Sequence, residues 1–255
     1  MRRHERVRRH VHNGHMARVT VLQLDPAVPL DRFGPWLDEL GLEVEVVEVW
    51  RDGMPADLEG GVLILGGTMD AYAEAEHPFL REVRELIVRR VETDQPTLGI
   101  CLGHQLIAVA LGGTVDVGAG EERGLVEVRW LDGAASDPVV GEAARAGLTA
   151  TASAHHDAVA HAPDGAQVLA ESDQFVQAIR VGSTWGLQFH PEASPELVEA
   201  WSTHAQEPDT AAMVTQLRTA EARVVALGRS IAHSFGRLVL DSLPHADSPR
   251  DGEHG

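Results

Sequence analysis

The sequence predicts an α/β protein in which helices flank an open, mostly parallel β-sheet, with antiparallel additions and a C-terminal helical extension. Three observations lead to this prediction. Short apolar or β-branched segments alternate with amphipathic ones for about 100 residues after Met16, which is typical of right-handed βαβ units. Residues 62–65 are wholly apolar, as expected for a parallel strand that helices cover on both faces. No linker rich in Pro, Gly or Ser then divides the chain into two domains.

The first half of the chain is expected to supply four strands and three helices. Each strand is a short run of aliphatic or β-branched residues, and each helix has apolar residues at spacings of three and four. Gly41 and the pair at 112–113 are C-cap residues that end the first and third helices. The strands cover residues 18–23, 43–49, 62–65 and 96–100, and the helices cover residues 30–40, 78–91 and 105–111.

The second half changes to short strands with turn signals, which we expect to be antiparallel additions to the same sheet. These strands cover residues 125–130, 167–170, 175–181 and 185–189. Ser194 and Pro195 then provide an N-cap and a first-turn proline for a helix over residues 194–204. Residues 210–243 have a long amphipathic pattern, in which Gly228 and Gly236 are the candidate positions for a break.

Composition excludes several classes of protein. The chain has a single cysteine, so it forms no internal disulfide and no four-cysteine metal site, and a cytoplasmic location is expected. No apolar run approaches the roughly 20 residues of a membrane span, so we expect no membrane association. The formal net charge is -18, and five of the 21 basic residues but only one of the 39 acidic residues precede Met16. The rest of the chain would repel nucleic-acid phosphates, so no nucleic-acid partner is expected.

The two ends of the chain are expected to lie outside the folded domain. Residues 1–15 are a basic leader that we expect to be disordered, ahead of a start at Met16; an arm that binds nucleic acid or a partner is the alternative. Residues 16–205 are expected to form one domain, and residues 244–255 a disordered tail. Residues 206–243 are expected to pack on the domain as a helical extension, with a docking surface for a partner as the alternative.

Cys101 lies in a Gly-x-Cys-x-Gly pattern, from Gly99 to Gly103, where an expected strand meets an expected helix. Such a sharp turn holds a residue above the edge of the sheet, and the flanking glycines remove side chains that would obstruct it. The N-terminus of the following helix stabilises a thiolate, the attacking form of cysteine. A lone cysteine is more often a small buried apolar residue, but this context favours a catalytic nucleophile.

His190 is the candidate base for this nucleophile. It follows the apolar segment 185–189 and is therefore expected at the carboxyl edge of the sheet, where open α/β folds bind ligands. Pro191 fixes the next turn, and Glu192 is near enough in sequence to orient the imidazole. The alternative is a surface histidine beside a glutamate that starts a helix.

Gly66 and Gly67 follow the apolar strand at residues 62–65, where a loop could present a backbone N–H to the nucleophile. Together with the N–H of Leu102, this group would form an oxyanion hole. By itself, a Gly-Gly pair after a strand indicates only a turn.

These motifs, in this order, resemble those of the class I, triad-type glutamine amidotransferases, the glutaminase domains found in GMP synthase and related enzymes. The resemblance extends from about Val19 to Trp201. It rests on Gly-Gly at 66–67, GICLGHQLIAVALGG at 99–113, His-His-Asp at 155–157 and GLQFHPE at 186–192. Residues 121–124 are similar to the segment after the nucleophile helix in stand-alone, GMP-synthase-like members. The resemblance implies a flavodoxin-like amidotransferase fold over residues 16–205.

The resemblance also implies a role for each matching residue. Cys101 is the nucleophile, His190 the general base and acid, and Glu192 the group that orients His190. The backbone N–H groups of Gly67 and Leu102 form the oxyanion hole, and the amino-acid end of the substrate is held by Gln105 and by the backbone of Ala154, His156 and Asp157. The implied reaction converts L-glutamine to glutamate and ammonia through a γ-glutamyl thioester, and it requires no metal and no nucleotide cofactor.

Departures from the family pattern leave other functions open. Family glutaminases usually pass ammonia to a synthetase, yet this sequence has no lysine and hence no phosphate-binding Gly-x-x-x-x-Gly-Lys-Ser/Thr loop. A separate synthetase or ligase partner is therefore one expectation, and a stand-alone hydrolase of γ-glutamyl amides or peptides is the alternative. A non-catalytic regulatory protein on the same scaffold is a third hypothesis, although no triad residue is lost. Position 156 is His where relatives commonly have Gly.

Overall fold

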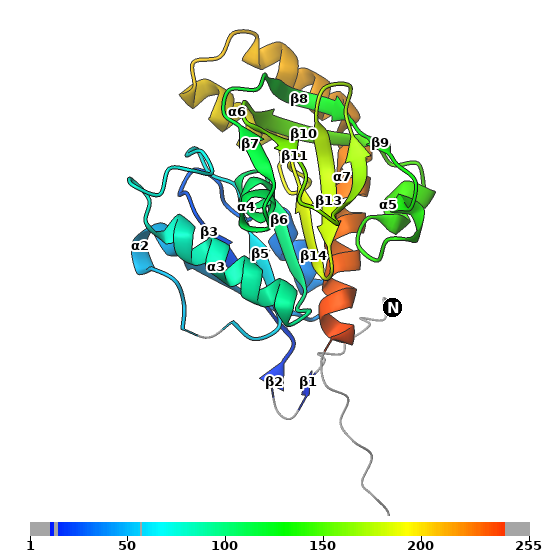
Figure 1. The fold of residues 1–255 in the computed structure, drawn as a ribbon. Helices are drawn as coiled ribbons and strands as arrows, with labels where there is room; N and C mark the ends of the chain where they lie inside the picture. The colour runs from blue at the N-terminus through cyan, green and yellow to red at the C-terminus, as the bar shows by residue number, and fades with distance from the viewer. Residues whose placement is uncertain (1–10, 13–14, 57, 243–255) are drawn as a thin grey trace, which may run out of the picture.

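An eight-stranded sheet forms the centre of the computed structural model, which describes residues 11–12, 15–56 and 58–242 (Figure 1). The strand order is β4-β3-β5-β6-β14-β13-β12-β9. Strands β4 to β14 in this order run parallel, and β13, β12 and β9 continue the sheet antiparallel. The strands are β3 (Arg18–Gln23), β4 (Glu43–Glu48), β5 (Gly61–Ile64), β6 (Thr97–Ile100), β9 (Arg129–Trp130), β12 (Gln167–Glu171), β13 (Val176–Val181) and β14 (Thr184–Leu187). This arrangement confirms the predicted fold class.

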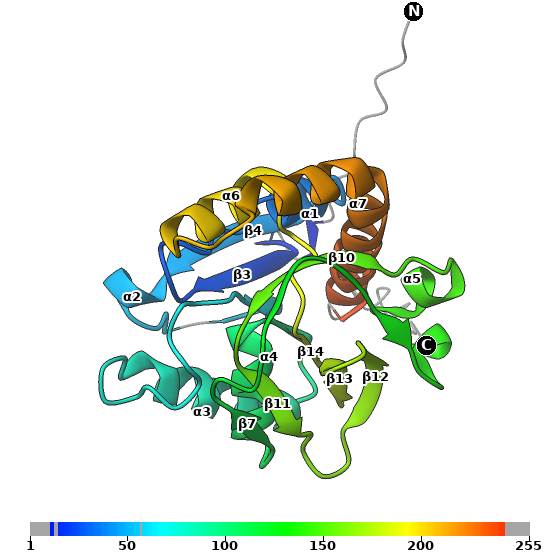
Figure 2. The same cartoon turned by 90° about the horizontal axis from the view of Figure 1, so that it is seen from above.

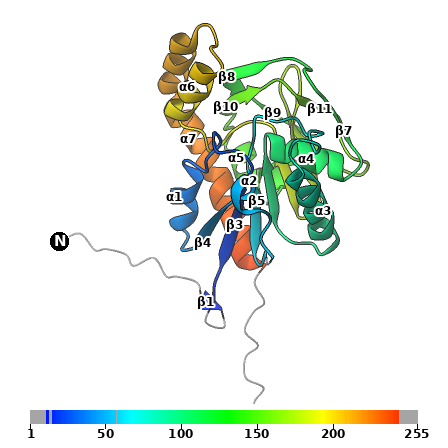
Figure 3. The same cartoon turned by 90° about the vertical axis from the view of Figure 1, so that its left-hand side faces the viewer.

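Helices cover both faces of the sheet, as Figures 2 and 3 show. One face is covered by α1 (Phe33–Asp38) and α7 (Thr210–Asp241), and the other by α3 (Phe79–Glu92) and α4 (Leu102–Ala110), whereas α6 (Pro195–His204) packs mainly on α7. Alternate residues of β5 pack against the two helical layers. Leu63 packs in the cluster that includes α1 and α7, whereas Val62 and Ile64 pack with α3 and α4. Burial on both faces explains why β5 has a wholly apolar sequence.

Several short elements were not predicted, and some predicted strands do not pair with the main sheet as expected. The unpredicted ones are α2 (Val49–Asp52), α5 (Gly141–Arg145), a 3-10 turn (Ala134–Ser136), β7 (Thr114–Asp116), β10 (Ala150–His155) and β11 (Ala158–His161). Strand β8 (Glu122–Glu127) pairs with β10, and β7 with β11, in two ribbons separate from the main sheet. The predicted strand 125–130 is therefore divided at Val128, and only β9 joins the sheet.

Strand β14 lies inside the sheet and is not a purely antiparallel addition. It pairs parallel with β6 on one side and antiparallel with β13 on the other. This position places the segment after β14 directly beside the segment after β6, because the carboxyl ends of parallel neighbours share one edge of the sheet.

The helix α7 is continuous through both glycines at which a break was expected. Each glycine allows a close contact with another element: a Cβ at Gly228 would overlap the carbonyl oxygen of Pro191, and one at Gly236 would stand 2.5 Å from Cδ1 of Leu40. Tertiary packing thus outweighs the low helix propensity of glycine. Buried Leu227, Ile231 and Phe235 on the same helix join the core under the sheet.

The ends of the chain lie mostly outside the described residues. Strands β1 (Val11–His12) and β2 (His15–Met16) pair antiparallel just before β3. The remainder of the predicted leader, residues 1–10 and 13–14, and the predicted tail, residues 244–255, are not described. Within the described ranges, no helix combines the length and the apolar character that a membrane span requires.

The buried guanidinium of Arg90, on α3, joins the amino-terminal ends of the central strands. It donates to the Thr97 hydroxyl (2.7 Å), to the Gln95 side chain (2.8 Å) and to the carbonyls of Leu58, Gly60 and Pro96. Burial lowers the pKa of Arg90 to about 10, so the side chain remains charged at neutral pH. These bonds hold α3 against β5 and β6.

Arg90→Met should lower the free energy of unfolding by about 3–5 kcal/mol, because it removes a buried charged donor from the Thr97 hydroxyl, the Gln95 side chain and the Leu58 and Gly60 carbonyls. Arg89→Met is the matched control: Arg89 is the preceding residue on the same helix but is not buried, so the change should stay within about 0.5 kcal/mol. Urea unfolding followed by circular dichroism measures both. Equal stabilities for the two variants would contradict the role assigned to Arg90.

Candidate active site

Three segments with predicted site residues leave the carboxyl ends of three neighbouring parallel strands. Gly66 and Gly67 follow β5, Cys101 follows β6, and His190 follows β14. These strands are adjacent in the order β5-β6-β14, so the topology brings the segments to one edge of the sheet. This is the edge at which open α/β sheets bind ligands.

Cys101 is held on a strained turn between β6 and α4. Its φ of 50° and ψ of -105° are unusual for a residue with a side chain, a conformation that costs about 1–3 kcal/mol. Its N–H donates to the Leu187 carbonyl on β14 (2.7 Å), which fixes the turn to the sheet. The flanking glycines are needed for close approach: a Cβ at Gly99 would stand 2.5 Å from the Gly103 carbonyl oxygen. The thiol therefore lies at the N-terminus of α4.

His190 and Glu192 form a buried pair beside this cysteine. His190 Nδ1 lies 2.7 Å from Glu192 Oε1, and the two side chains are 3% and 0% exposed. A Cβ placed on Gly66 would stand 3.2 Å from His190 Cε1 and 3.4 Å from Cys101 Cβ, so both side chains border the same small space. The N–H of His190 donates to the Ala152 carbonyl on β10 (2.8 Å), which anchors the segment.

The charge state of His190 is set by opposing effects. Burial disfavours the imidazolium, but the charges of Glu192 and Cys101, and hydrogen bonds to both side chains, raise the pKa of His190 above its ordinary value. The arrangement therefore favours an imidazolium that can donate a proton while it stabilises a neighbouring thiolate.

Gly67 lies against the first turn of α4, as an oxyanion hole requires. A Cβ at Gly67 would stand 2.8 Å from Leu102 Cδ2, so the loop after β5 and the start of α4 are in contact. Leu102 is the first residue of α4, where backbone N–H groups have no acceptor within the helix. The loop of Gly67 and the N-terminus of α4, which begins directly after Cys101, therefore lie side by side.

Asp25 fixes the loop that contains Gly67. Its Oδ2 accepts hydrogen bonds from the Thr68 N–H (3.0 Å) and hydroxyl (2.5 Å), and its Oδ1 accepts one from the Ala27 N–H (2.8 Å). Burial alone would raise the pKa of the Asp25 carboxyl, but these hydrogen bonds and the charge of His77 lower it overall. Asp25 therefore remains ionised at neutral pH and loses this role only as the pH falls through its lowered pKa.

Asp25→Asn should lower kcat about 10- to 10²-fold with little change in KM, because it loosens the loop of Gly67, whose N–H is predicted to be an oxyanion donor that acts mainly in the transition state. Asp70→Asn is the control: Asp70 caps the N–H of Tyr72 in the same loop (2.8 Å), farther from Gly67. Steady-state kinetics of both variants gives the comparison. A rise in KM at unchanged kcat would show that Asp25 acts on substrate binding instead.

The residues predicted to hold the amino-acid end of the substrate come together only in part. Gln105, on α4, donates from Nε2 to the Asp157 carbonyl (3.0 Å), which also lies 3.1 Å from His155 Nδ1. Ala154 is half-buried on β10, and its partner across the ribbon is Arg123 of β8. Gln105 and the 154–157 backbone thus share one wall of the site.

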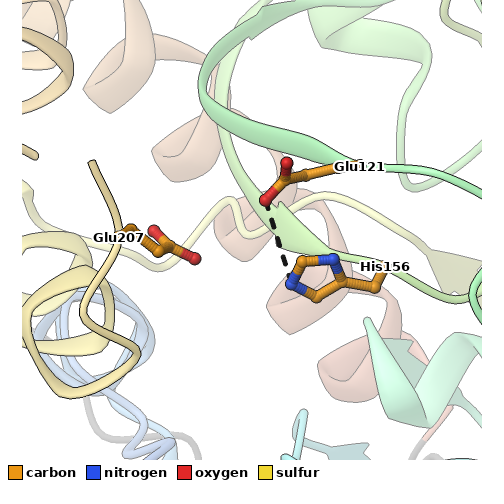
Figure 4. Close-up of side chains that lie close together, drawn as sticks. All are labelled: Glu121, His156 and Glu207. Carbon is orange, nitrogen blue, oxygen red and sulfur yellow. Dashed lines mark ion pairs between the residues drawn. The ribbon is translucent and has the colours of Figure 1, made fainter. Parts of the chain in front are cut away.

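The side chain of His156 points to the surface, away from this wall. It is 64% exposed and lies 3.9 Å from Glu121, with Glu207 close by (Figure 4). The ligand atoms of these three residues lie within 4.8 Å of one another, as in a metal site. However, Arg123 pairs with both carboxylates, at 2.7 Å in the case of Glu207, so a side-chain cation of the protein already occupies their charged face. The cluster is therefore best described as a surface ion-pair network.

Sequence reasoning missed several polar residues that support the site. Gln188 donates from Nε2 to the Cys101 sulfur (3.7 Å), and Glu122 lies 3.2 Å from His155 and accepts from Gln177 (2.6 Å). Gln188 belongs to the motif at 186–192 and His155 to the His-His-Asp motif at 155–157, so their positions were visible in the sequence. The loop-fixing role of Asp25 had no sequence signal, because its partner is 43 residues away.

Comparisons with known proteins match the same motifs. A family model described as class I glutamine amidotransferase matches residues 36–200. The chain is 38% identical over 144 residues to a subunit of the glutamine-hydrolysing GMP synthase from Halobacterium salinarum, an alignment that covers 55% of this chain and 70% of that protein. The corresponding GMP synthase subunit from Methanopyrus kandleri is 38% identical over 162 residues, 61% of this chain and 79% of that protein.

A solved structure shows the same fold. The crystal structure of a glutamine amidotransferase from Thermotoga maritima superposes with a TM-score of 0.76 at 24% identity, covering 87% of this chain and 99% of that one. At this identity the likeness is one of fold alone, whereas the match to the family model spans the motifs around Cys101 and His190. The chain therefore belongs to the class I glutamine amidotransferase family, whose members are cysteine-dependent enzymes, and is similar to the glutamine-hydrolysing subunits of GMP synthase.

Proposed function

We propose that the protein hydrolyses the side-chain amide of L-glutamine through a Cys101–His190–Glu192 triad. The observation that supports this most strongly is the buried His190–Glu192 pair, 2.7 Å between Nδ1 and Oε1, bordering the same space as the strained Cys101. Relatives named as glutamine-hydrolysing GMP synthase subunits suggest the substrate.

In the first half of the reaction, the Cys101 thiolate attacks the amide carbon of glutamine. A carbon–sulfur bond forms, and the carbonyl oxygen becomes an oxyanion that accepts hydrogen bonds from the N–H groups of Gly67 and Leu102. The His190 imidazolium donates its proton to the amide nitrogen, the carbon–nitrogen bond breaks, and ammonia leaves. The product is a γ-glutamyl thioester on Cys101.

In the second half, the now neutral His190 takes a proton from water as the water attacks the thioester carbon. The carbon–sulfur bond breaks, glutamate leaves, and the thiolate–imidazolium pair is restored. Glu192 holds Nδ1 of His190 throughout, so that Nε2 faces the reacting atoms. Gln105 and the 154–157 backbone hold the amino-acid end of the substrate.

The ammonia is proposed to pass to a separate synthetase or ligase. The relatives from Halobacterium salinarum and Methanopyrus kandleri are named as subunits of a GMP synthase, and this sequence contains no lysine and hence no phosphate-binding loop of the Gly-x-x-x-x-Gly-Lys-Ser/Thr type. In keeping with the names of these relatives, the acceptor is proposed to be bound by a partner, and glutaminase activity is expected to rise when that partner is present.

The test combines turnover with thiol labelling. Purified protein is incubated with glutamine and glutamate release is measured; in parallel, Cys101 is treated with a glutamine analogue that carries a diazoketone in place of the amide. We expect glutamate release and labelling that excess glutamine prevents. Labelling no faster than that of an ordinary thiol would contradict the nucleophile assignment. Faster turnover of γ-glutamyl amines than of glutamine would instead identify a γ-glutamyl amide hydrolase.

A further inference from the structure

Helix α7 reaches the turn that joins His190 to Glu192. A Cβ on Gly228 would overlap the carbonyl oxygen of Pro191 and would stand 3.0 Å from Cζ3 of Trp36. The backbone of α7 is therefore in direct contact with the peptide between the two residues of the buried pair. Figures 2 and 3 show α7 beside α6 and α1 on this side of the sheet.

A second residue of α7, two helical turns before Gly228, also supports the 190–192 turn. Glu221 lies seven residues before Gly228 and so projects from a similar face of the helix. Its carboxylate pairs with the guanidinium of Arg32, and the backbone N–H of Arg32 donates to the Glu192 carbonyl oxygen (3.4 Å). Helix α7 thus acts on the Pro191 carbonyl directly and on the Glu192 carbonyl through Arg32.

The carboxylate of Glu192 depends on this support, because few side chains hold it. Its Oε1 bonds to His190, whereas its Oε2 is buried and has no hydrogen-bond partner among the residues that the structure describes. With a single side-chain hydrogen bond, the position of the carboxylate follows from the position of its backbone. That backbone is held by the contact with Gly228 and the hydrogen bond from Arg32, in addition to the bond from His190 to the Ala152 carbonyl.

We propose that α7 is part of the catalytic apparatus, with Gly228 as a positioning residue that keeps the 190–192 turn in place, so that Glu192 holds His190 against Cys101; this rests on the function proposed above. Helix α7 begins at Thr210, beyond residues 36–200 that match the family model. Helix α7 therefore supports the triad from outside the residues that match the family model.

A purely structural role for α7 leaves the glycine unexplained. Leu227, Ile231 and Phe235 account for the packing of the helix on the core. Alanine is the better helix former, so a buried glycine in the middle of α7 lowers helix stability unless the absent Cβ is needed. At position 228 the space is taken by a backbone carbonyl, which cannot move without moving the turn.

Gly228→Ala tests the proposal, and Gly236→Ala is its matched control. Both changes add one methyl group at a buried glycine of the same helix. At Gly236 the methyl group meets the side chains of Leu40 and Leu42, which can rotate away and lie in the segment that follows α1. The two variants therefore differ mainly in whether the added group presses on the 190–192 turn.

We expect Gly228→Ala to lower kcat about 10²-fold with KM within about twofold, since a displacement of about 1 Å at catalytic groups has an effect of this size. Gly236→Ala should retain the wild-type kcat. Glu221→Gln, which adds no bulk, should lower kcat in the same direction by a smaller factor. Thermal unfolding of all three variants verifies that each is folded at the assay temperature.

A second measurement does not depend on glutamine: the rate of Cys101 alkylation by iodoacetamide against pH. The ionisable side chains that act on His190 are Glu192 and Cys101. If the turn moves in Gly228→Ala, His190 shifts relative to Cys101, and the pH dependence of alkylation should differ from that of the wild-type protein.

The outcomes separate this inference from the proposed function. Wild-type kcat and an unchanged alkylation profile in folded Gly228→Ala would overturn the role of α7 while leaving the triad intact. An equal loss in Gly228→Ala and Gly236→Ala would also overturn it, because the effect would then be one of general packing. A wild-type protein without glutaminase activity would contradict the proposed function, and the alkylation profiles would still decide the role of α7.

Discussion

Replacing Cys101 by alanine should abolish glutamine hydrolysis while leaving the fold intact. The thioester cannot form without the sulfur, and His190 and the oxyanion donors alone give only a small residual acceleration, so we expect kcat to fall by about 10⁴-fold or more. The side chain is small and Cys101 is 6% exposed, so the loss of one buried sulfur should change the free energy of unfolding by no more than about 1 kcal/mol.

The measurement is glutamate release by the variant, with urea unfolding as the check on folding. Cys101→Ser is the conservative control, since it keeps a nucleophilic atom at the same position. A hydroxyl is far less acidic than a thiol, and His190 is arranged to stabilise an existing thiolate, so we expect this variant to be inactive as well. Residual turnover near the wild-type rate in either variant would exclude Cys101 as the nucleophile.

Glu192→Gln should produce the second large effect, a fall in kcat of about 10³- to 10⁴-fold at neutral pH. The amide keeps the shape of the side chain but removes the negative charge that offsets the cost of burying the His190 imidazolium. It can also hold the wrong tautomer of His190. Glu196→Gln is the control, because Glu196 is an exposed residue on the first turn of α6 that pairs only with Arg218 among the described residues. It should keep full activity.

The pH dependence of this variant has a definite sign. Glu192 and the Cys101 thiolate raise the pKa of His190, so the imidazolium, and the activity that needs it, should persist above the ordinary imidazole range and disappear as the pH rises through the raised pKa. Without the charge of Glu192 this pKa falls, and the alkaline limb of kcat/KM should move to lower pH. An alkaline limb at the same pH in both proteins would contradict the assigned role of Glu192.

The parallel half of the fold could be predicted closely because its signals are local. The apolar run of β5, the glycines around Cys101 and the cap at Ser194 each determine structure within a few residues; the Ser194 side chain indeed accepts from the Leu197 N–H (3.2 Å). The pairing of the second half is set by contacts between distant segments. Strand β10 has alanine at every second position, so it has little intrinsic strand preference and forms through its pairing with β8.

The same distinction applies to the site. Cys101, His190 and Glu192 lie in motifs whose local geometry could be inferred, and the structure places Gly67 against Leu102 and bonds Gln105 to the Asp157 carbonyl. The residues that hold these groups in position were not predicted. Asp25 acts on a loop 43 residues away, and Gly228 acts on Pro191 from a helix outside the motifs. Such contacts depend on how whole layers pack, which no short pattern records.

Cys101 is proposed to attack the glutamine side chain and to carry the γ-glutamyl group. The most direct test is to mix the protein with glutamine, quench with acid during turnover, digest, and analyse the peptide that contains Cys101 by mass spectrometry. We expect a γ-glutamyl adduct on Cys101 in the wild-type protein, in larger amount in a variant with slowed thioester hydrolysis, and none in Cys101→Ala. Steady glutamate release without an adduct on Cys101, or with the adduct on another residue, would contradict the account.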